Sequence, residues 1–264
     1  MSSRIIMAGA VELAADVDDG DGPAVVLLHG LAGYRGEWDV TALWLRAAGY
    51  RVAAYDGRGH GDSTRRPGDV SREATVEDAA AVLRAIDGGP HVLMGQSLGA
   101  HTAFLTAAAH PELVSALVVL EAGPARAEPS DHIARWLASW PLPFPDRAAA
   151  AEFLGAGPVG AAWAAGLITA ADGGLVPRFD PDIIVATIEA HADRPYWEQW
   201  AAITVPTLVV LAGNGYIDAD EEREMVRLRP GTTVVRLPGL GHDLHLEDPV
   251  AVRDAVLPFL GHAR

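Results

Sequence analysis

The sequence predicts an α/β fold: a mostly parallel, doubly wound sheet of about eight strands, with a helical lid inserted after the sixth strand. Short, continuous apolar runs alternate with segments of helical spacing along most of the chain, which is typical of parallel strands covered by helices on both faces. This alternation lapses between residues 124 and 202. We therefore expect a core domain built from residues 1–123 and 203–264, and a lid built from residues 124–202.

Each element of the core is predicted from its local pattern. Residues 4–16 alternate loosely and predict a hairpin at the edge of the sheet, and the turn-rich stretch 18–23 ends it. The remaining predicted strands are 24–28, 51–55, 92–96, 113–120, 204–212 and 233–237, and the predicted helices are 37–48, 73–86, 98–110, 220–228 and 248–260. Right-handed crossovers place the loops after the parallel strands along one edge of the sheet, so we expect the functional residues there.

Composition excludes several classes of protein. Half of the 264 residues are hydrophobic, which is too many for a disordered chain. No apolar run approaches the ~18 to 20 residues of a membrane span. The chain has no cysteine, so disulfides, thiolate catalysis and cysteine metal sites are ruled out. The first ten residues lack the pattern of a secretory signal, and we expect a cytoplasmic protein.

The charge balance argues against polyanionic partners. The formal net charge is −15 at pH 7, whereas nucleic acids and anionic membranes bind basic surfaces. All 20 basic residues are arginine, so Schiff-base chemistry and a phosphate-binding P-loop lysine are excluded. We expect a small neutral or apolar molecule as the partner, unless a local arginine reverses that preference.

A candidate nucleophile stands at Ser97. Residues 95–99 read Gly-Gln-Ser-Leu-Gly, between an apolar run and a helical pattern. A serine in this context occupies a sharp strand-to-helix turn that exposes its hydroxyl at the end of the sheet. Gly95 and Gly99 let the strand and helix approach the turn, and the helix N-terminus lies where an oxyanion would form. The plain alternative is a strand–turn–helix with an incidental serine.

Four motifs in register resemble the α/β-hydrolase family. They are His29-Gly30, Asp56-Gly57-Arg58-Gly59-His60-Gly61, the Gly-x-Ser-x-Gly motif and Gly241-His242. The resemblance covers nearly all of the chain except the lid. It implies that Ser97 is the nucleophile and that His242 is its general base. It also implies an oxyanion hole formed by the backbone N–H groups of Leu31 and Leu98.

The acid that orients His242 departs from the family pattern. The family usually places this acid after the penultimate strand, where this chain has Tyr216. Glu121 directly follows a buried strand, where some members of the fold carry their acid, and a carboxylate there requires a partner. We therefore predict Glu121 as the acid, with Asp218 as the alternative and Asp220 behind both. Asp218 could equally open a capping box for the next helix, and Glu121 could cap a loop.

Other polar residues near these motifs have simpler explanations. His245 is expected at the entry to the last helix, and the set His242, His245 and Glu247 lacks the spacing of known zinc sites. We therefore predict no metal. Five further side chains are expected to stabilise their own loops by hydrogen bonds: His29, Asp56, Arg58, His60 and Asp62.

The lid is expected to determine the substrate. It holds five of the seven tryptophans: Trp136, Trp140, Trp163, Trp197 and Trp200. Such side chains suit an apolar pocket over the nucleophile, although most of them could instead attach the lid helices to the core. We predict that Trp136, Trp140, Trp163, Gly30 and Gln96 contact the substrate.

Together these residues predict a serine hydrolase without a cofactor. It would cleave an ester, lactone or related acyl bond of a small, largely apolar substrate through an acyl-enzyme intermediate. A serine nucleophile excludes the family's dehalogenation and epoxide opening in their usual form. Two alternatives stay open: a ligand-binding protein of the same fold with a silent site, which the displaced acid favours, and cofactor-free chemistry such as carbon–carbon cleavage or perhydrolysis.

Overall fold

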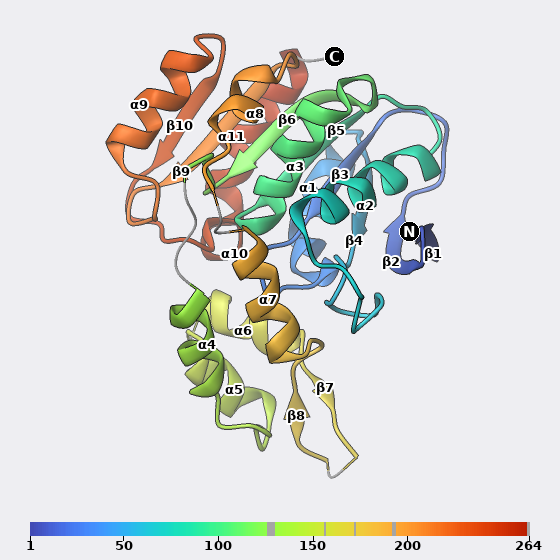
Figure 1. Ribbon diagram of the computed structural model, residues 1–264, viewed down its shortest axis with the longest axis vertical. Helices are drawn as coiled ribbons and strands as arrows, with labels where there is room; N and C mark the ends of the chain where they lie inside the picture. Colours follow the sequence, from blue (N-terminus) through green and yellow to red (C-terminus); the bar gives the residue numbers. More distant parts are fainter. Residues whose placement is uncertain (126–129, 156, 172, 192–193, 263–264) are drawn as a thin grey trace.

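An eight-stranded sheet with helices on both faces forms the body of the molecule (Figure 1). The computed structural model describes residues 1–125, 130–155, 157–171, 173–191 and 194–262. The strands of this sheet are β1 (Ser2–Ala8), β2 (Val11–Val17), β3 (Ala24–Leu28), β4 (Arg51–Tyr55), β5 (His91–Gln96), β6 (Val114–Leu120), β9 (Thr207–Ala212) and β10 (Thr233–Leu237).

The strand order is β1-β2-β4-β3-β5-β6-β9-β10. Strands from β4 to β10 in this order are parallel to their neighbours, whereas β1 and β2 form the predicted edge hairpin, which joins β4 in antiparallel pairing. The order reverses around β3, so the chain winds outward in both directions. The mostly parallel, doubly wound sheet of about eight strands is therefore confirmed.

Helices of the core follow the strands as predicted, with ends displaced by a few residues. They are η1 (Arg35–Trp38), α1 (Asp39–Ala47), α2 (Arg72–Ala85), α3 (Leu98–Ala109), η2 (Pro111–Leu113), α8 (Trp197–Ala202), α9 (Ala219–Leu228), α10 (Leu244–Glu247) and α11 (Pro249–His262). The two elements labelled η are short 3₁₀ helices, and η1 forms the first turn of the helix predicted from residue 37.

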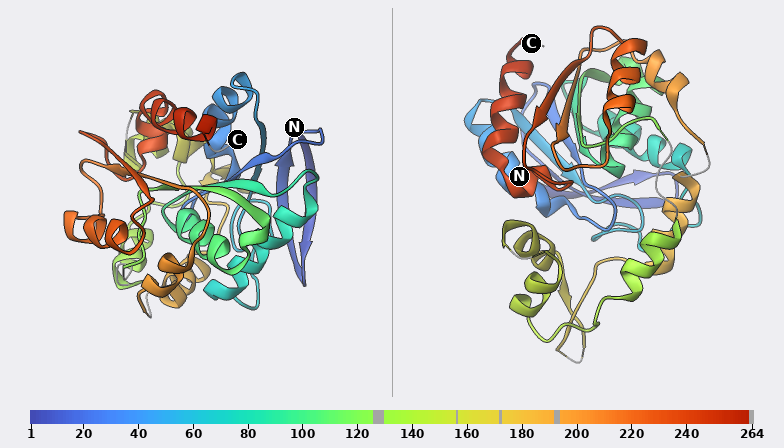
Figure 2. Two further views of the ribbon diagram at one scale, coloured as in Figure 1. Left: turned by 90° about the horizontal axis from the view of Figure 1, so that it is seen from above. Right: turned by 90° about the vertical axis from the view of Figure 1, so that its left-hand side faces the viewer.

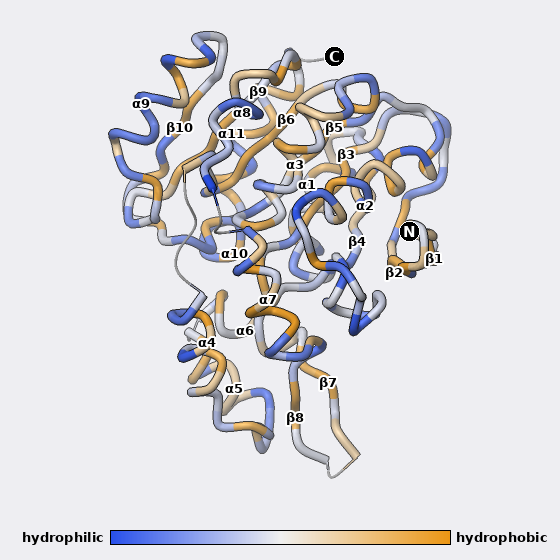
Figure 3. The backbone as a smooth tube through the Cα atoms, in the orientation of Figure 1, coloured by the Kyte–Doolittle hydropathy of each residue, from blue (hydrophilic) through white to orange (hydrophobic). Residues whose placement is uncertain are grey.

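Both faces of the sheet are buried, which explains the continuous apolar runs. Along β3, Val26 and Leu28 belong to a core cluster shared with α2 and α3. Val25 and Leu27 point the other way, into a cluster shared with α1 and α11. Figure 2 shows these two helix layers on opposite sides of the sheet. The strands of the sheet centre are largely hydrophobic, whereas the outer helix α9 is largely hydrophilic (Figure 3).

Six of the described elements between β6 and β9 form a separate group below the sheet in Figure 1. These are α4 (Ser130–Ala138), α5 (Arg147–Phe153), α6 (Gly157–Ala165), β7 (Ile168–Thr169), β8 (Leu175–Val176) and α7 (Pro181–His191). They enclose an apolar cluster of their own, which includes Leu137, Phe144 and Phe179. In the part of the chain that the structure describes, no helix has the length and apolar character needed to cross a bilayer.

This inserted segment differs from the purely helical lid that we expected over residues 124–202. The short hairpin of β7 and β8 interrupts the helices, and the turn between its strands contains Gly173 with a φ of 89°, which favours glycine. Helix α8 packs on α3, and its Trp200 side chain is fully buried in the core of the sheet. By its packing, the last part of the expected lid therefore belongs with the core.

Helix α3 passes very close to β3 at Gly99. A Cβ atom at this position would lie 2.2 Å from the carbonyl oxygen of Leu28 and 2.4 Å from that of His29. Both are backbone atoms, so a side chain at residue 99 would displace either the helix or the strand. Gly261, near the end of α11, is the opposite case, because a Cβ atom there would meet nothing within 4 Å.

We expect Gly99→Ala to lower the free energy of unfolding by about 1 to 3 kcal/mol, as overpacking in a core does. The matched change Gly261→Ala should raise it by up to about 1 kcal/mol, because alanine is the better helix former. Urea denaturation of both variants measures the difference. Equal stability of the two variants would contradict the close approach of α3 to β3.

Candidate active site

Ser97 stands between β5 and α3 in a strained backbone conformation. Its φ is 51° and its ψ is −120°, a region that residues other than glycine rarely adopt. The Ser97 N–H donates to the Leu120 carbonyl at 3.0 Å, and the His101 N–H donates to the Ser97 carbonyl at 2.9 Å. A Cβ atom at Gly95 would lie 2.5 Å from the Ala100 nitrogen. The turn is as sharp as the motif predicts.

A cavity of about 520 Å³ opens beside Ser97. It lies between the carboxyl ends of β5, β6 and β9 on one side and α4, α6 and α7 on the other. Nine of the residues predicted for the site line it: Gly30, Leu31, Gln96, Ser97, Leu98, Glu121, Trp136, Trp163 and His242. The fold therefore brings the candidate nucleophile, the candidate base and both oxyanion-hole residues to one space.

Two buried histidines hold the loop of the predicted oxyanion hole. The His29 Nδ1 donates to the Gly30 carbonyl at 2.7 Å, and its Nε2 accepts from the Gly57 N–H at 2.9 Å. The His60 Nε2 accepts from the Ala32 N–H at 3.1 Å. Burial lowers the pKa of both rings, that of His60 to about 3, so both stay neutral and can accept. Their predicted role in the loops is confirmed.

The loop that carries His242 is attached to the nucleophile strand. The Gln96 Nε2 donates to the His242 carbonyl oxygen at 2.9 Å. The Gly241 N–H donates to Glu247 Oε2 at 2.8 Å. The Tyr216 ring lies against the imidazole, with ring centroids 4.6 Å apart. Gln96, which we expected to contact substrate, lines the cavity and also bridges these two chain segments.

The imidazole of His242 is free to act as a base. Burial lowers the pKa of His242 to about 4, so the ring is neutral at pH 7. Among the interactions of the described residues, its Nδ1 has no hydrogen-bond partner, and no hydrogen bond joins the ring to the Ser97 hydroxyl. Hydrogen bonds of catalytic groups are often long without substrate and tighten in the complex.

The Glu121 carboxylate makes neither a hydrogen bond nor an ion pair with His242 within the described chain, contrary to our expectation. Its Oε2 accepts from the Ala212 N–H at 2.6 Å, and its Oε1 accepts from the N–H groups of Tyr216 at 2.6 Å and Ile217 at 3.2 Å. Buried backbone N–H groups require acceptors. The carboxylate therefore turns toward the loop after β9 and organises it.

Asp218, the alternative acid, is also engaged elsewhere. Its Oδ1 accepts from the N–H groups of Asp220 and Glu221, both at 2.8 Å. These bonds satisfy the first turn of α9, as the capping-box explanation predicts. In the conformation described, neither carboxylate that we weighed for the triad is bonded to the His242 ring.

Two of the three predicted lid tryptophans line the cavity. The rings of Trp136 and Trp163 are perpendicular, with centroids 5.7 Å apart. Trp140 is 6% exposed and packs against Phe144 and Phe179 in the inserted segment, so the prediction that it contacts substrate is corrected. Trp136 lies within α4, whereas Trp140 follows the end of that helix at Ala138, and packing decides which of the two rings faces the cavity.

Two carboxyl groups in the cavity wall, the buried Glu37 and the half-buried Asp243, were not among the predicted site residues. Burial raises the pKa of Glu37 well above its usual range, and the Asp243 charge raises it further. Burial raises the pKa of Asp243 to about 6, although a hydrogen bond from Trp163 opposes this. In the sequence both are ordinary loop and helix-start residues, so only the fold reveals the pair.

Over the described residues, no three histidine, aspartate or glutamate side chains are arranged to hold a metal ion. The His245 ring packs against Trp38, with centroids 4.6 Å apart, and the Glu247 carboxylate accepts from the Gly241 N–H. No metal-binding group is therefore formed by the three residues that we considered from the sequence, His242, His245 and Glu247.

Comparisons with known proteins agree with this architecture. A family model described as "Alpha/beta hydrolase family" matches residues 25–255. The sn-1-specific diacylglycerol lipase ABHD11 of Mus musculus is 31% identical over 261 residues, which cover 94% of this chain and 85% of that protein. The 2-(acetamidomethylene)succinate hydrolase of Mesorhizobium japonicum is 25% identical over 251 residues, with 92% and 90% covered.

Solved structures share the fold. The crystal structure of E-2-(acetamidomethylene)succinate hydrolase superposes with a TM-score of 0.88, covering 98% of this chain and 99% of that one, at 23% identity. The enol-lactonase of Burkholderia xenovorans LB400 superposes with a TM-score of 0.79 at 22% identity, covering 98% and 100%. At these identities the likeness concerns the fold alone.

The buried imidazole of His242 should titrate with a midpoint of about 4, because burial disfavours its charged form. Ring ¹⁵N chemical shifts measured by NMR against pH would report this, with the His242 signal assigned by its absence from His242→Gln. At pH 6 the ring should still be neutral. A midpoint close to the ordinary histidine value would show that the His242 ring is exposed to water and not buried.

We expect Glu121→Gln to loosen the loop after β9, because the new amide group cannot accept the hydrogen bond that one carboxylate oxygen accepts now. The amide hydrogen of Tyr216 should exchange about tenfold faster or more. The matched control Asp218→Asn keeps a good helix cap and should leave that exchange unchanged. Unaltered exchange in Glu121→Gln would rule out the loop-holding role.

Proposed function

The chain belongs to the alpha/beta hydrolase family and is a hydrolase, and from this premise we propose that it cleaves an ester, lactone or related acyl bond through an acyl-enzyme intermediate on Ser97. The observation that carries the proposal is the single cavity lined by Ser97, His242, Leu31 and Leu98. A relative named as a diacylglycerol lipase supports the choice of an acyl bond.

In the proposed first step, His242 removes the proton of the Ser97 hydroxyl as the oxygen attacks the acyl carbon. The neutral state of the ring at pH 7 suits this task, because only a neutral imidazole can accept the proton. His242 then protonates the leaving group. In the second half, His242 activates water, which releases the acyl group from Ser97.

The tetrahedral intermediates carry a negative oxygen that needs donors. We assign this role to the backbone N–H groups of Leu31 and Leu98, each contributing ~3 kcal/mol of transition-state stabilisation. Helix α3 begins at Leu98 and adds the positive end of its dipole. The hydrogen bonds of His29 and His60 hold the Leu31 loop in place before substrate arrives.

We propose Glu121 as the acidic residue of the site, in an indirect role. Its carboxylate holds the backbone of the loop that presents Tyr216 to the His242 ring. It thereby limits the orientations of the imidazole, the task that a directly bonded acid performs in other triads. Asp218 is the weaker choice, because its carboxylate is engaged in the cap of α9.

We propose that the inserted segment expected over residues 124–202 serves as the lid, apart from helix α8, which packs with the core. Trp136 and Trp163 form an aromatic wall of the cavity opposite Ser97, supported from behind by Trp140. Together with Ile133 and Ile188 they make that wall largely apolar. A small, largely apolar acyl group is the substrate portion that this wall would hold.

One observation favours a second candidate, a ligand-binding protein with a silent site. Within the described residues the Nδ1 of His242 lacks the carboxylate that would orient it. In several serine hydrolases such a loss reduces turnover severely. Cofactor-free chemistry such as carbon–carbon cleavage or perhydrolysis would use the same groups and is the third candidate.

A fluorophosphonate probe tests the proposed nucleophile directly. We expect covalent labelling at Ser97 and hydrolysis within a panel of short and long acyl esters, lactones and thioesters. Ser97→Ala should abolish labelling and lower kcat by ~10³-fold or more. The matched control Ser3→Ala, on the exposed edge strand β1, should change neither. Mass spectrometry locates the label.

Other outcomes identify the alternatives. A folded protein that is not labelled at Ser97 would favour the ligand-binding candidate. Labelling at Ser97 without hydrolysis of any member of the panel would favour the non-hydrolytic candidate.

A further inference from the structure

Arg72 is a buried cation that the chain leaves partly unpaired. Its side chain is 1% exposed and lines a small cavity that shares Gly30 and Leu98 with the main cavity. The Nη2 donates to the Thr102 hydroxyl at 2.6 Å. Over the described residues, its Nε and Nη1 are buried without any hydrogen-bond partner. Burial lowers the pKa of Arg72 only to about 10, so the guanidinium remains charged at pH 7.

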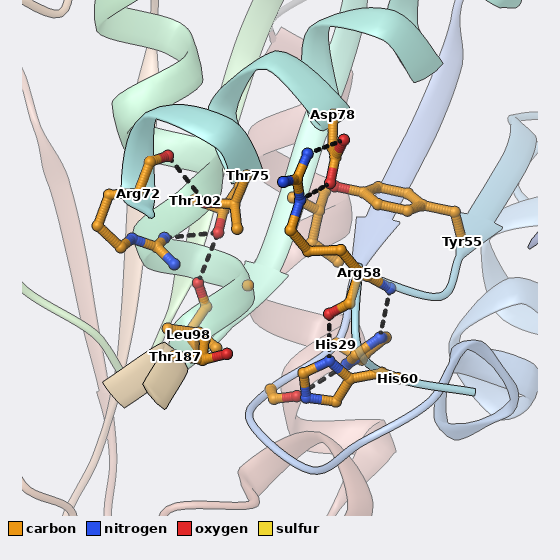
Figure 4. Close-up of a pocket in the computed structure, with 14 residues that line it drawn as sticks. His29, Tyr55, Arg58, His60, Arg72, Thr75, Asp78, Leu98, Thr102 and Thr187 are labelled. Carbon is orange, nitrogen blue, oxygen red and sulfur yellow. Dashed lines mark hydrogen bonds and ion pairs between the residues drawn. The ribbon is translucent and has the colours of Figure 1, made fainter. Parts of the chain in front are cut away.

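A neighbouring arginine shows what is missing. Arg58 lines the same small cavity, and its guanidinium forms two hydrogen bonds with the Asp78 carboxylate, at 2.6 and 2.7 Å (Figure 4). Arg72 has no such carboxylate among the described residues. Glu73, next to it in sequence, is paired with Arg194 at the surface, at 3.0 Å. A buried charge without a counter-charge is costly, so Arg72 calls for a partner from outside the chain.

Two buried histidines continue the same cluster of unpaired nitrogen atoms. Within the described chain, both ring nitrogens of His101 and the Nδ1 of His191 have no hydrogen-bond partner. The two rings are in contact, with centroids 3.8 Å apart. Burial lowers the pKa of both rings; His191 and then Arg72 lower the pKa of His101 further, and Arg72 lowers that of His191 further. The Arg72 guanidinium is bonded to Thr102, the residue that follows His101 in α3. We call Arg72, His101 and His191 the Arg72 cluster.

Over the described residues, the hydroxyl groups around the cluster donate to backbone carbonyls, and none of them accepts from the Arg72 Nε or Nη1. The Thr102 hydroxyl, which accepts from Arg72, itself donates to the Leu98 carbonyl at 3.0 Å. The Thr75 hydroxyl donates to the Arg72 carbonyl at 2.9 Å, and that of Thr187 donates to the Ile183 carbonyl at 2.8 Å. The unpaired atoms of the Arg72 cluster are all nitrogens, and those of arginine can only donate. The missing partner is therefore an acceptor.

Two helix N-termini add to the positive potential at this point. Arg72 is the first residue of α2, which has 14 residues, and Leu98 is the first residue of α3, which has 12. Both residues line the small cavity. Helix N-termini attract anions, and a cation placed at one is unfavourable unless an anion compensates it.

The space available suits a small ligand. The small cavity has a volume of about 40 Å³, enough for a few waters or one compact ion, since a single water needs ~10 to 15 Å³ by this measure. Gly30 and Leu98 line both this cavity and the main one, and His101 and His191 line the main cavity. Within the Arg72 cluster, His101 and His191 therefore form part of the wall of the candidate active site, and Arg72 lines the adjoining small cavity.

We propose that the Arg72 cluster is a binding site for one compact monovalent anion. The anion is either a free ion such as a halide, or the carboxylate of a molecule bound in the main cavity. Its acceptor atoms would take the Nε and Nη1 hydrogens of Arg72 and a ring N–H of His101 or His191. The proposal goes beyond the hydrolase activity proposed above and does not rest on it.

Crystals of the wild-type protein soaked in sodium bromide provide the first test. We expect an anomalous bromide peak within hydrogen-bonding distance of the Arg72 guanidinium. The melting temperature should rise with bromide concentration, because an ion that binds only the folded state stabilises it. Arg72→Met should lose that rise, whereas the matched variant Arg84→Met, on the exposed side of the same helix, should share only the general effect of salt.

A second arm identifies the source of the anion. The kcat/KM of the p-nitrophenyl monoester of succinate is compared with that of p-nitrophenyl butyrate, a neutral ester with the same number of acyl carbons. If a substrate carboxylate is the natural occupant, Arg72→Met should lower the first value about tenfold or more relative to the second. Sodium butyrate in the melting experiment tests whether a carboxylate stabilises the wild-type protein but not Arg72→Met, and this measurement needs no turnover. A protein without hydrolase activity would therefore refute the hydrolase proposal and leave the anion site testable.

The proposal is overturned if the bromide crystals contain only water at Arg72, and if neither bromide nor butyrate gives a rise in melting temperature that Arg72→Met removes. An anomalous peak at Arg72 supports the free ion. A selective loss on the succinate ester supports the carboxylate. The diffraction experiment needs only the wild-type protein, so it still tests the proposal if Arg72→Met fails to fold.

Discussion

The close packing of α3 on the strands beneath it is the constraint on which the whole site depends. The helix starts immediately after β5, and its first turn runs over the backbone of β3 with no room for a Cβ atom at Gly95 or Gly99. Ser97 absorbs the reversal of the chain in a backbone conformation that costs about 1 to 3 kcal/mol. The surrounding core offsets this cost and fixes the position of the hydroxyl.

Local patterns in the sequence were sufficient to predict the fold and the turn at Ser97. Continuous apolar runs and the Gly-x-Ser-x-Gly motif depend on neighbouring residues, and they led to the sheet and to the turn at Ser97. The contacts of Glu121 could not be predicted, because they depend on where the loop after β9 places its N–H groups. The same holds for Trp140, whose orientation is decided by packing within the inserted segment.

The charged groups near the main cavity lie in two places: carboxyl groups line the cavity itself, and Arg72 lies beside the adjoining small cavity. Four carboxyl side chains are among the described residues that line the main cavity: Glu37, Glu121, Glu221 and Asp243. Burial raises the pKa of Glu37, Glu221 and Asp243, because it disfavours the charged form of each carboxyl group. A net charge of −15 for the whole chain therefore says little about the potential that a ligand meets inside.

The hydrogen bond from Gln96 to the His242 carbonyl joins residues that are 146 positions apart. During synthesis the N-terminal part of the chain can form its strands early, but this bond cannot form until the last strand has left the ribosome and docked. Long-range contacts of this kind are closed late and slowly. Nascent and truncated chains would therefore hold the turn at Ser97 before the His242 loop is fixed beside it.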